Sequence, residues 1–154
     1  GEARGATWDE FDLEKGLWIV PKTRMKAYRE HVVPLSRRPL RIVQRCARLR
    51  VAGCELVFPG RRRNHPLSDM TLSKLLHDMG EHYTAHGFRS SFRDWVSEET
   101  NHPSDVAEAA LAHTIANKTE AAYRRGNLLE KRRVMMLEWA AYCEGEPVKR
   151  ETVR

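Results

Sequence analysis

The sequence predicts one mostly helical α+β domain with a small antiparallel β-sheet near the N-terminus. The first third of the chain carries short runs of branched and aromatic residues between turn signals, which are typical of strands. The remainder carries apolar residues at helical spacing. The length of 154 residues is enough for one domain with a hydrophobic core.

The expected strands come first. Residues 7–13 read as a strand that ends in a polar turn. Residues 17–20 form a second strand, and residues 32–35 are its expected hairpin partner across a basic loop. Residues 56–58 could add a further short strand.

Helices are expected over most of the rest. Ser36 is a candidate N-cap for a helix with an apolar face at Leu40, Val43, Cys46 and Ala47. Asn117 opens a pattern that resembles a capping box at the start of the helix that holds Tyr123. The other predicted apolar stripes are Leu72, Leu75, Leu76 and Met79, ending at Gly80; Phe88, Phe92, Trp95 and Val96; Val106, Ala109, Ala110 and His113; and a long helix over 128–143.

Composition narrows the class of partner. The formal net charge is +6, so a polyanion such as nucleic acid is a candidate partner, although a merely basic surface would give the same number. The cysteines are three in number and form no CxxC pair, which favours a reducing cytosol over a disulfide framework or a cysteine zinc site. No apolar run approaches the roughly 20 residues that span a bilayer, and no signal peptide is evident.

The order and spacing of four residues indicate a candidate reactive site. His86 and Arg89 lie three residues apart and share a helix face, away from the aromatic residues of the same helix. His113 follows, and Tyr123 comes ten residues later. A guanidinium can grip two non-bridging phosphate oxygens at once. Each residue alone has a simpler interpretation: Arg89 in a surface salt bridge, His113 as a core histidine, and Tyr123 as a half-buried tyrosine.

The segment 85–95 (AHGFRSSFRDW), followed by Leu111-Ala-His113 and Ala122-Tyr123-Arg124, resembles the tyrosine recombinase (phage integrase) family. It is most similar to the integrases of prophages and genomic islands. The family pattern is H-x-x-R, then L-x-H, then a nucleophilic tyrosine. The strand region also matches, at residues 8–12, 25–26 and 31–36.

This resemblance implies the catalytic core of DNA breaking-rejoining enzymes over residues 1–145, followed by a polar tail at 146–154. The implied function is site-specific recombination, the integration or excision of a prophage or genomic island. Strands are cut and rejoined through a 3′-phosphotyrosine. The family uses a second arginine just before a Gly-Glu pair, and this chain begins at Gly1-Glu2. We therefore expect that arginine and a core-binding domain upstream, and a fragment that is inactive or weak alone.

The family pattern also implies a role for each site residue. Tyr123 attacks phosphorus, Arg89 neutralises the phosphate and His113 donates a hydrogen bond to it. His86 is a candidate base or orienting group for the tyrosine hydroxyl. None of these steps requires a metal or cofactor, and the histidines show no ligand spacing such as HExxH.

The acid that protonates the leaving 5′-oxygen is the hairpin lysine of the family. Lys26 lies at that place, with Lys22 as its competitor. Arg93 is expected to pair with Asp94 or Glu98 or to contact a phosphate. The residues suited to backbone phosphates, each with a solvated charge as the simpler reading, are Lys22, Arg24, Arg29, Arg61, Arg62, Arg63 and Arg93.

The expected partners are double-stranded DNA attachment sites and other integrase protomers in a synaptic tetramer, with no membrane. The expected location is the bacterial cytoplasm, at the nucleoid when in use. Three alternatives stay open: a non-catalytic DNA-binding module on the same fold, an enzyme resembling type IB topoisomerases, and a structural or protein-interaction domain.

Overall fold

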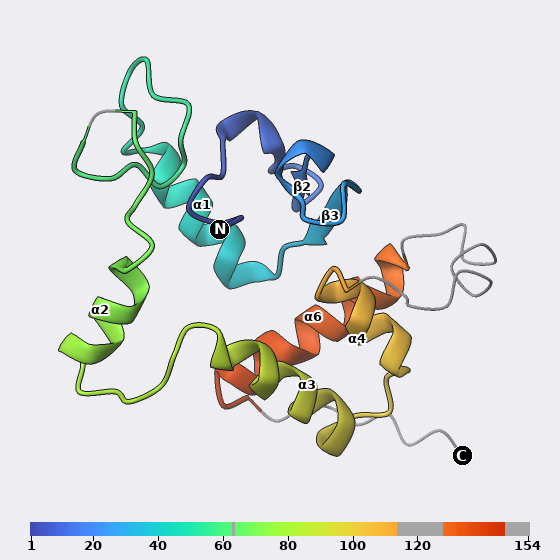
Figure 1. Ribbon diagram of the computed structural model, residues 1–154. Helices are drawn as coiled ribbons and strands as arrows, with labels where there is room; N and C mark the ends of the chain where they lie inside the picture. The colour runs from blue at the N-terminus through green and yellow to red at the C-terminus, as the bar shows by residue number, and fades with distance from the viewer. Residues whose placement is uncertain (63, 114–127, 147–154) are drawn as a thin grey trace.

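Two small hydrophobic cores organise the structure, a computed structural model that describes residues 1–62, 64–113 and 128–146 (Figure 1). One core lies under the N-terminal sheet and the first helix. The other lies among three helices from the second half of the chain. An exposed excursion carrying a short helix connects them.

The sheet has three antiparallel strands in the order β1-β2-β3: β1 (Phe11–Asp12), β2 (Leu17–Val20) and β3 (His31–Pro34). Trp18 pairs with Val33, which confirms the predicted hairpin. A short 3-10 turn, η2 (Lys22–Arg24), lies in the basic loop between β2 and β3.

Two strand predictions were wrong in extent. Residues 8–10 form a 3-10 turn, η1 (Trp8–Glu10), because Glu10 turns inward to pair with Arg24 and to accept a hydrogen bond from Trp18. Only the last part of the expected strand 7–13 pairs with β2. The segment at 56–58 contributes a single bridge, Leu56 to Thr7, rather than a strand.

The N-terminal core contains Ala6, Val43 and Val57, with partly buried aromatic residues around them. Helix α1 (Arg37–Ala47) supplies Val43 and begins directly after Ser36, as predicted. The Ser36 hydroxyl makes no capping hydrogen bond. Its buried position therefore reflects packing rather than a side-chain cap.

The second core is formed by α3 (Gly87–Glu99), α4 (Ser104–Ala110) and α6 (Leu129–Cys143). Its buried members are Phe92, Trp95, Val96, Val106, Ala107 and Met135. Trp139 packs edge-on against Phe92, with ring centroids 5.4 Å apart. This confirms the predicted aromatic face of α3, except that Phe88 is half exposed, at 54%.

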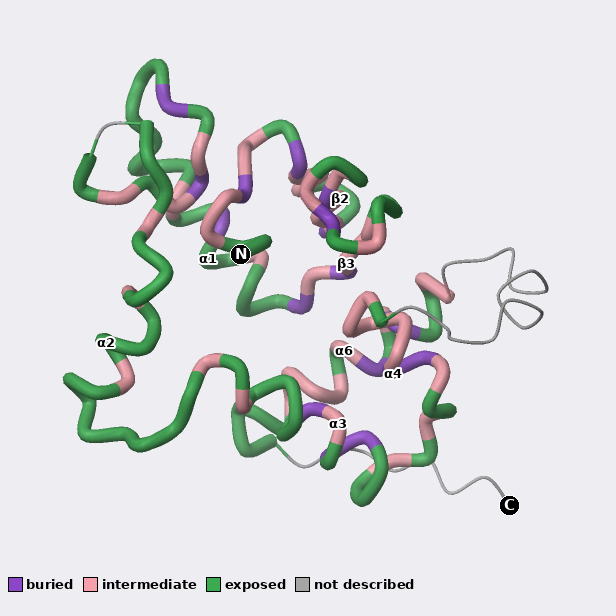
Figure 2. Tube along the Cα trace, in the orientation of Figure 1, coloured by how far each residue is buried: buried purple, intermediate pink, exposed green. Residues whose placement is uncertain are grey.

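Helix α2 (Thr71–Asp78) lies on the excursion between the cores and ends before Gly80, as predicted. Its apolar stripe is not packed away, and Figure 2 shows the helix almost entirely exposed. The exposed members of the stripe are Leu72, Leu75 and Met79. The apolar spacing therefore predicts the helix correctly, but it does not predict that the helix is exposed.

A buried arginine joins the two cores. Arg132 of α6 is only 2% exposed and donates a hydrogen bond to the carbonyl of Val32 in β3, at 2.6 Å. Burial lowers the pKa of its guanidinium to about 10, so the group is still charged at neutral pH. A charge-assisted bond at such a site contributes more than a neutral one.

Replacing Arg132 with Met should lower the free energy of unfolding by about 2 kcal/mol, because the Val32 carbonyl loses a charged donor in a buried place. Urea denaturation measures this loss. The matched control is Lys131→Met, on an exposed position of the same helix, which should change stability by less than about 0.5 kcal/mol. Equal losses in the two variants would mean that the Arg132 contact does not hold the cores together.

Candidate active site

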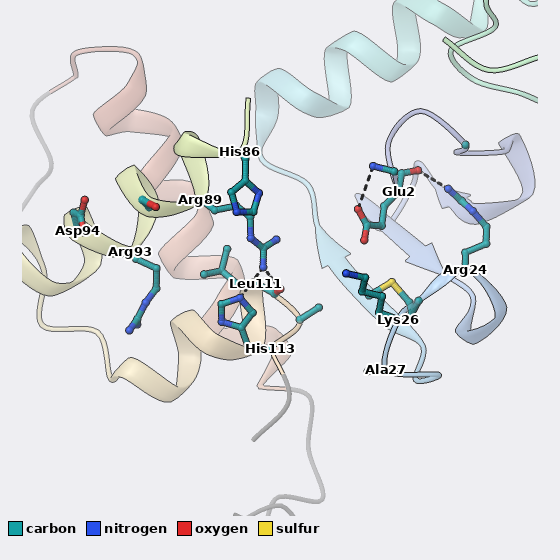
Figure 3. A pocket seen from close by; sticks show the side chains of 15 residues that line it. Glu2, Arg24, Lys26, Ala27, His86, Arg89, Arg93, Asp94, Leu111 and His113 are labelled. Carbon is teal, nitrogen blue, oxygen red and sulfur yellow. Dashed lines mark hydrogen bonds and ion pairs between the residues drawn. The ribbon is translucent and has the colours of Figure 1, made fainter. Parts of the chain in front are cut away.

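A cleft of about 1180 Å³ lies between the two halves of the molecule (Figure 3). The N-terminal half contributes Glu2 and Lys26 to its lining. The helical half contributes His86, Arg89 and His113 from the opposite wall. Six of the residues singled out from the sequence therefore line one cavity, although they span the chain from residue 24 to residue 113: Arg24, Lys26, His86, Arg89, Arg93 and His113.

Arg89 extends into this cleft from the first turns of α3. One terminal nitrogen of its guanidinium donates to the carbonyl of Leu111 at 2.8 Å. The same nitrogen lies 2.8 Å from Nε2 of His113. The two motifs H-x-x-R and L-x-H thus meet through a direct contact between their functional side chains.

The backbone at the end of α4 determines where His113 points. Ala112 adopts a left-handed conformation, with φ of 54°. Its amide bonds to the carbonyl of Ala109, and the amide of His113 bonds to the carbonyl of Glu108 at 3.0 Å. This is the hydrogen-bond pattern of a Schellman motif, which ends a helix and reverses the chain. His113 is thereby folded back over Glu108.

Glu108 contacts a nitrogen-bearing side chain through each of its carboxylate oxygens. One carboxylate oxygen lies 2.5 Å from Nδ1 of His113, and the other lies 2.9 Å from a guanidinium nitrogen of Arg93. Arg93 therefore pairs with neither of the acids expected from its neighbours in the sequence. The result is a continuous series of contacts from Arg93 through Glu108 and His113 to Arg89.

On the opposite wall, two basic residues in or just after η2 have different surroundings. Arg24 is held within the protein, by the buried carboxylate of Glu10 and by the backbone carbonyl of Glu2. Lys26 is exposed and lines the cleft, directly after the buried Met25. Lys22 is exposed but is not among the lining residues.

The remaining predicted phosphate contacts lie elsewhere. Arg29, Arg61 and Arg62 are exposed and do not line the cleft. Arg63 and Tyr123 fall outside the described residues, as do Asn117 and the part of the polar tail from residue 147.

His31 is a neighbour that the sequence did not indicate. This residue begins β3 and is partly buried. Burial lowers the pKa of His31 to about 4, and the positive charges of Arg132 and Arg89 act in the same direction, whereas Glu2 opposes them. The neutral ring is therefore part of the folded structure at neutral pH.

Glu108 was also missed, since a single glutamate on a helix is usually a solvated charge. The available signal was its place five residues before His113, which a helix C-terminal reversal brings within reach.

Within residues 1–62, 64–113 and 128–146, no group of three or more His, Cys, Asp or Glu side chains could hold a metal ion. None of the helices in these ranges is long and apolar enough to cross a bilayer.

The family model and the relatives that match this chain all belong to one family. The family model described as "Phage integrase family" matches residues 1–129. The chain is 41% identical over 142 residues to prophage integrase IntA of Escherichia coli (strain K12), covering 90% of this chain and 34% of that protein. It is 34% identical over 161 residues to the integrase of Enterobacteria phage P4, covering 93% of this chain and 36% of that one.

The chain thus spans about a third of the length of these curated relatives. No solved structure matches it significantly.

Acid should destabilise the fold through His31. The unfolded chain binds a proton at this residue near its usual pKa of 6.5, but the folded chain does so only near 4, so protons favour unfolding between those values. Between pH 7 and pH 4.5 the wild type should lose about 1 to 2 kcal/mol more than His31→Gln, allowing for screening of the partly exposed ring.

Urea denaturation of both proteins across this pH range measures the difference. Carboxylates that titrate in the same range are common to the two proteins and cancel. Parallel pH profiles would show that His31 is not held neutral by the fold.

Proposed function

Because this chain belongs to the phage integrase family, we propose that it forms most of the catalytic domain of a site-specific DNA recombinase. The enzyme integrates or excises a mobile genetic element by cutting and rejoining DNA at attachment sites. The observation that carries the proposal is the contact between Arg89 and His113 in a cleft that Lys26 faces from the other wall.

The charges of the cleft support a phosphodiester as its ligand. Arg24 and Arg93 are paired with Glu10 and Glu108 respectively. Among the described residues, no carboxylate forms an ion pair with Arg89 or Lys26 within 4 Å. These two cations are therefore the ones available to an anion that enters the cleft.

The reaction follows from these groups. Arg89 binds the non-bridging oxygens of the scissile phosphate, and His113 adds a hydrogen bond to them. The hydroxyl oxygen of Tyr123 attacks phosphorus, with His86 as its base or orienting group, and a 3′-phosphotyrosine bond forms. The bond from phosphorus to the 5′-oxygen breaks, and Lys26 gives that oxygen a proton. Attack by a 5′-hydroxyl on the phosphotyrosine reverses the steps and rejoins the strand.

The second arginine of the family pattern belongs, in this proposal, just before Gly1. The backbone of Gly1 and Glu2 lines the cleft, so a side chain from the preceding residue would lie near the phosphate. The exposed Lys22, Arg29, Arg61 and Arg62, together with Arg63, contact flanking phosphates, and four protomers assemble on two DNA sites in the cytoplasm. These contacts add affinity and salt dependence without sequence information.

Two alternatives use the same cleft. A non-catalytic DNA-binding module would bind DNA without forming a covalent bond. An enzyme resembling type IB topoisomerases would form the bond and relax supercoils without recombining sites. The similarity to integrases of phages and prophages favours recombination over both.

The decisive test uses an integrase in which this chain is extended to the length of its relatives, together with a nicked suicide duplex carrying its attachment site. A protein–DNA band that survives boiling in detergent should form with the wild type. Tyr123→Phe should abolish the band and leave DNA binding nearly unchanged, because the hydroxyl is the nucleophile but not a main source of affinity. An unchanged band in the variant would assign the nucleophile elsewhere, and no band from a wild type that binds DNA would favour the binding module.

The lysine roles can be separated with a second substrate. Lys26→Ala should slow cleavage by about 10²- to 10⁴-fold. A 5′-phosphorothiolate should restore the rate, because its sulfur leaves without a proton. Lys22→Ala is the matched control, since Lys22 is exposed in the same loop between β2 and β3 but does not line the cleft. Rescue of Lys22→Ala instead of Lys26→Ala would reverse the assignment.

A further inference from the structure

We propose that Glu108 is the positioning residue for His113, fixing its tautomer and balancing the charge that it carries when a phosphate binds. The inference deepens the function proposed above and rests on it. No part of the family pattern quoted above includes this glutamate. The observation that carries the inference is that Glu108 contacts His113 on the side opposite Arg89.

The proton positions follow from which groups can donate. A guanidinium has only N–H donors, so Nε2 of His113 must accept from Arg89 across their 2.8 Å contact. The ring proton then sits on Nδ1, where it is donated to the Glu108 carboxylate. Arg89 and Glu108 thus act together to select the tautomer in which Nε2 faces Arg89 with its lone pair and Nδ1 donates to the carboxylate.

A phosphate changes this arrangement. When the N–H groups of Arg89 turn to the phosphate oxygens, Nε2 must become a donor if His113 is to bind the same anion. That requires a second proton on the ring, and the resulting imidazolium would lie among Arg89, Arg93 and His86 of its own wall and Lys26 across the cleft. Glu2 and Asp94 are the carboxylates that line the cleft with His113. Among the described residues, Glu108 is the carboxylate that contacts the ring. Glu108 therefore offsets a charge that the neighbouring cations oppose.

The backbone makes the pair rigid. The amide of His113 bonds to the carbonyl of Glu108, so the two residues are joined through main chain as well as side chain. The second carboxylate oxygen is fixed by Arg93. A carboxylate held at both oxygens restricts the orientation of the ring, as a carboxylate does for a metal-bound histidine.

The test compares three variants of the extended integrase. Glu108→Ala removes both the acceptor and the charge, and Glu108→Gln keeps an acceptor without the charge. The control is Glu138→Ala, which removes a carboxylate from another histidine pair, His102–Glu138 at 2.9 Å, outside the cleft. The control allows for any general loss of stability.

The readouts are the rate of covalent adduct formation on the suicide duplex and the ¹⁵N shifts of His113 in ¹⁵N-histidine-labelled protein. We expect Glu108→Ala to slow cleavage about 10- to 100-fold, the range seen when the partner of a functional histidine is lost. Its His113 ring should also show a weaker Nδ1–H preference, because Arg89 is then the one partner left that favours this tautomer. Glu108→Gln should keep the tautomer and still cleave more slowly than wild type, and Glu138→Ala should match wild type in both readouts.

Two results would overturn the inference: Glu108→Ala cleaving as fast as Glu138→Ala, or an unchanged His113 tautomer in Glu108→Ala. If Glu108→Gln forms the adduct at the wild-type rate, Glu108 does not balance the charge on His113, and the positioning role alone remains. If the wild type forms no adduct at all, the proposed function fails, and the tautomer measurement still decides whether Glu108 positions the ring.

Discussion

The hydrogen bond from the buried guanidinium of Arg132 to the Val32 carbonyl is the contact on which the arrangement of this molecule depends. The two hydrophobic cores are small, with three fully buried members in one and six in the other among the described residues. Small cores supply little stability on their own. The two cores meet where α6 packs against β3 and α1, and the Arg132 bond lies at this seam.

The fold divides the basic side chains into those paired with carboxylates of the protein and those that are not. Some arginines are bound to carboxylates of the protein, as Arg24 is to Glu10 and Arg93 is to Glu108. Arg89 is held by a backbone carbonyl and a ring nitrogen of His113, neither of which carries a negative charge. A site for an anion is thus defined less by the number of positive residues than by which of them the fold leaves without a counter-charge.

Local patterns predicted what depends on neighbours in sequence. The hairpin of β2 and β3 and the aromatic face of α3 followed from branched residues and helical spacing, and both are confirmed. The strand expected at residues 7–13 was wrong because an inward-facing Glu10 depends on Arg24, fourteen residues away. Glu108 and His31 were missed because their surroundings also depend on the fold: Glu108 meets His113 only where the chain reverses after α4, and His31 is buried only when the two halves pack together. The place of Tyr123 relative to the cleft stays a prediction.

The excursion that carries α2 has a consequence for how the two cores stay together. The chain passes from one core to the other through residues 59–86, and α2 on this segment is largely exposed (Figure 2). Such a segment acts as a tether, which keeps the two halves at a high effective concentration while the non-covalent seam sets their orientation. Severing the tether would convert an intramolecular docking step into a bimolecular one, so the integrity of the cleft would come to depend on protein concentration.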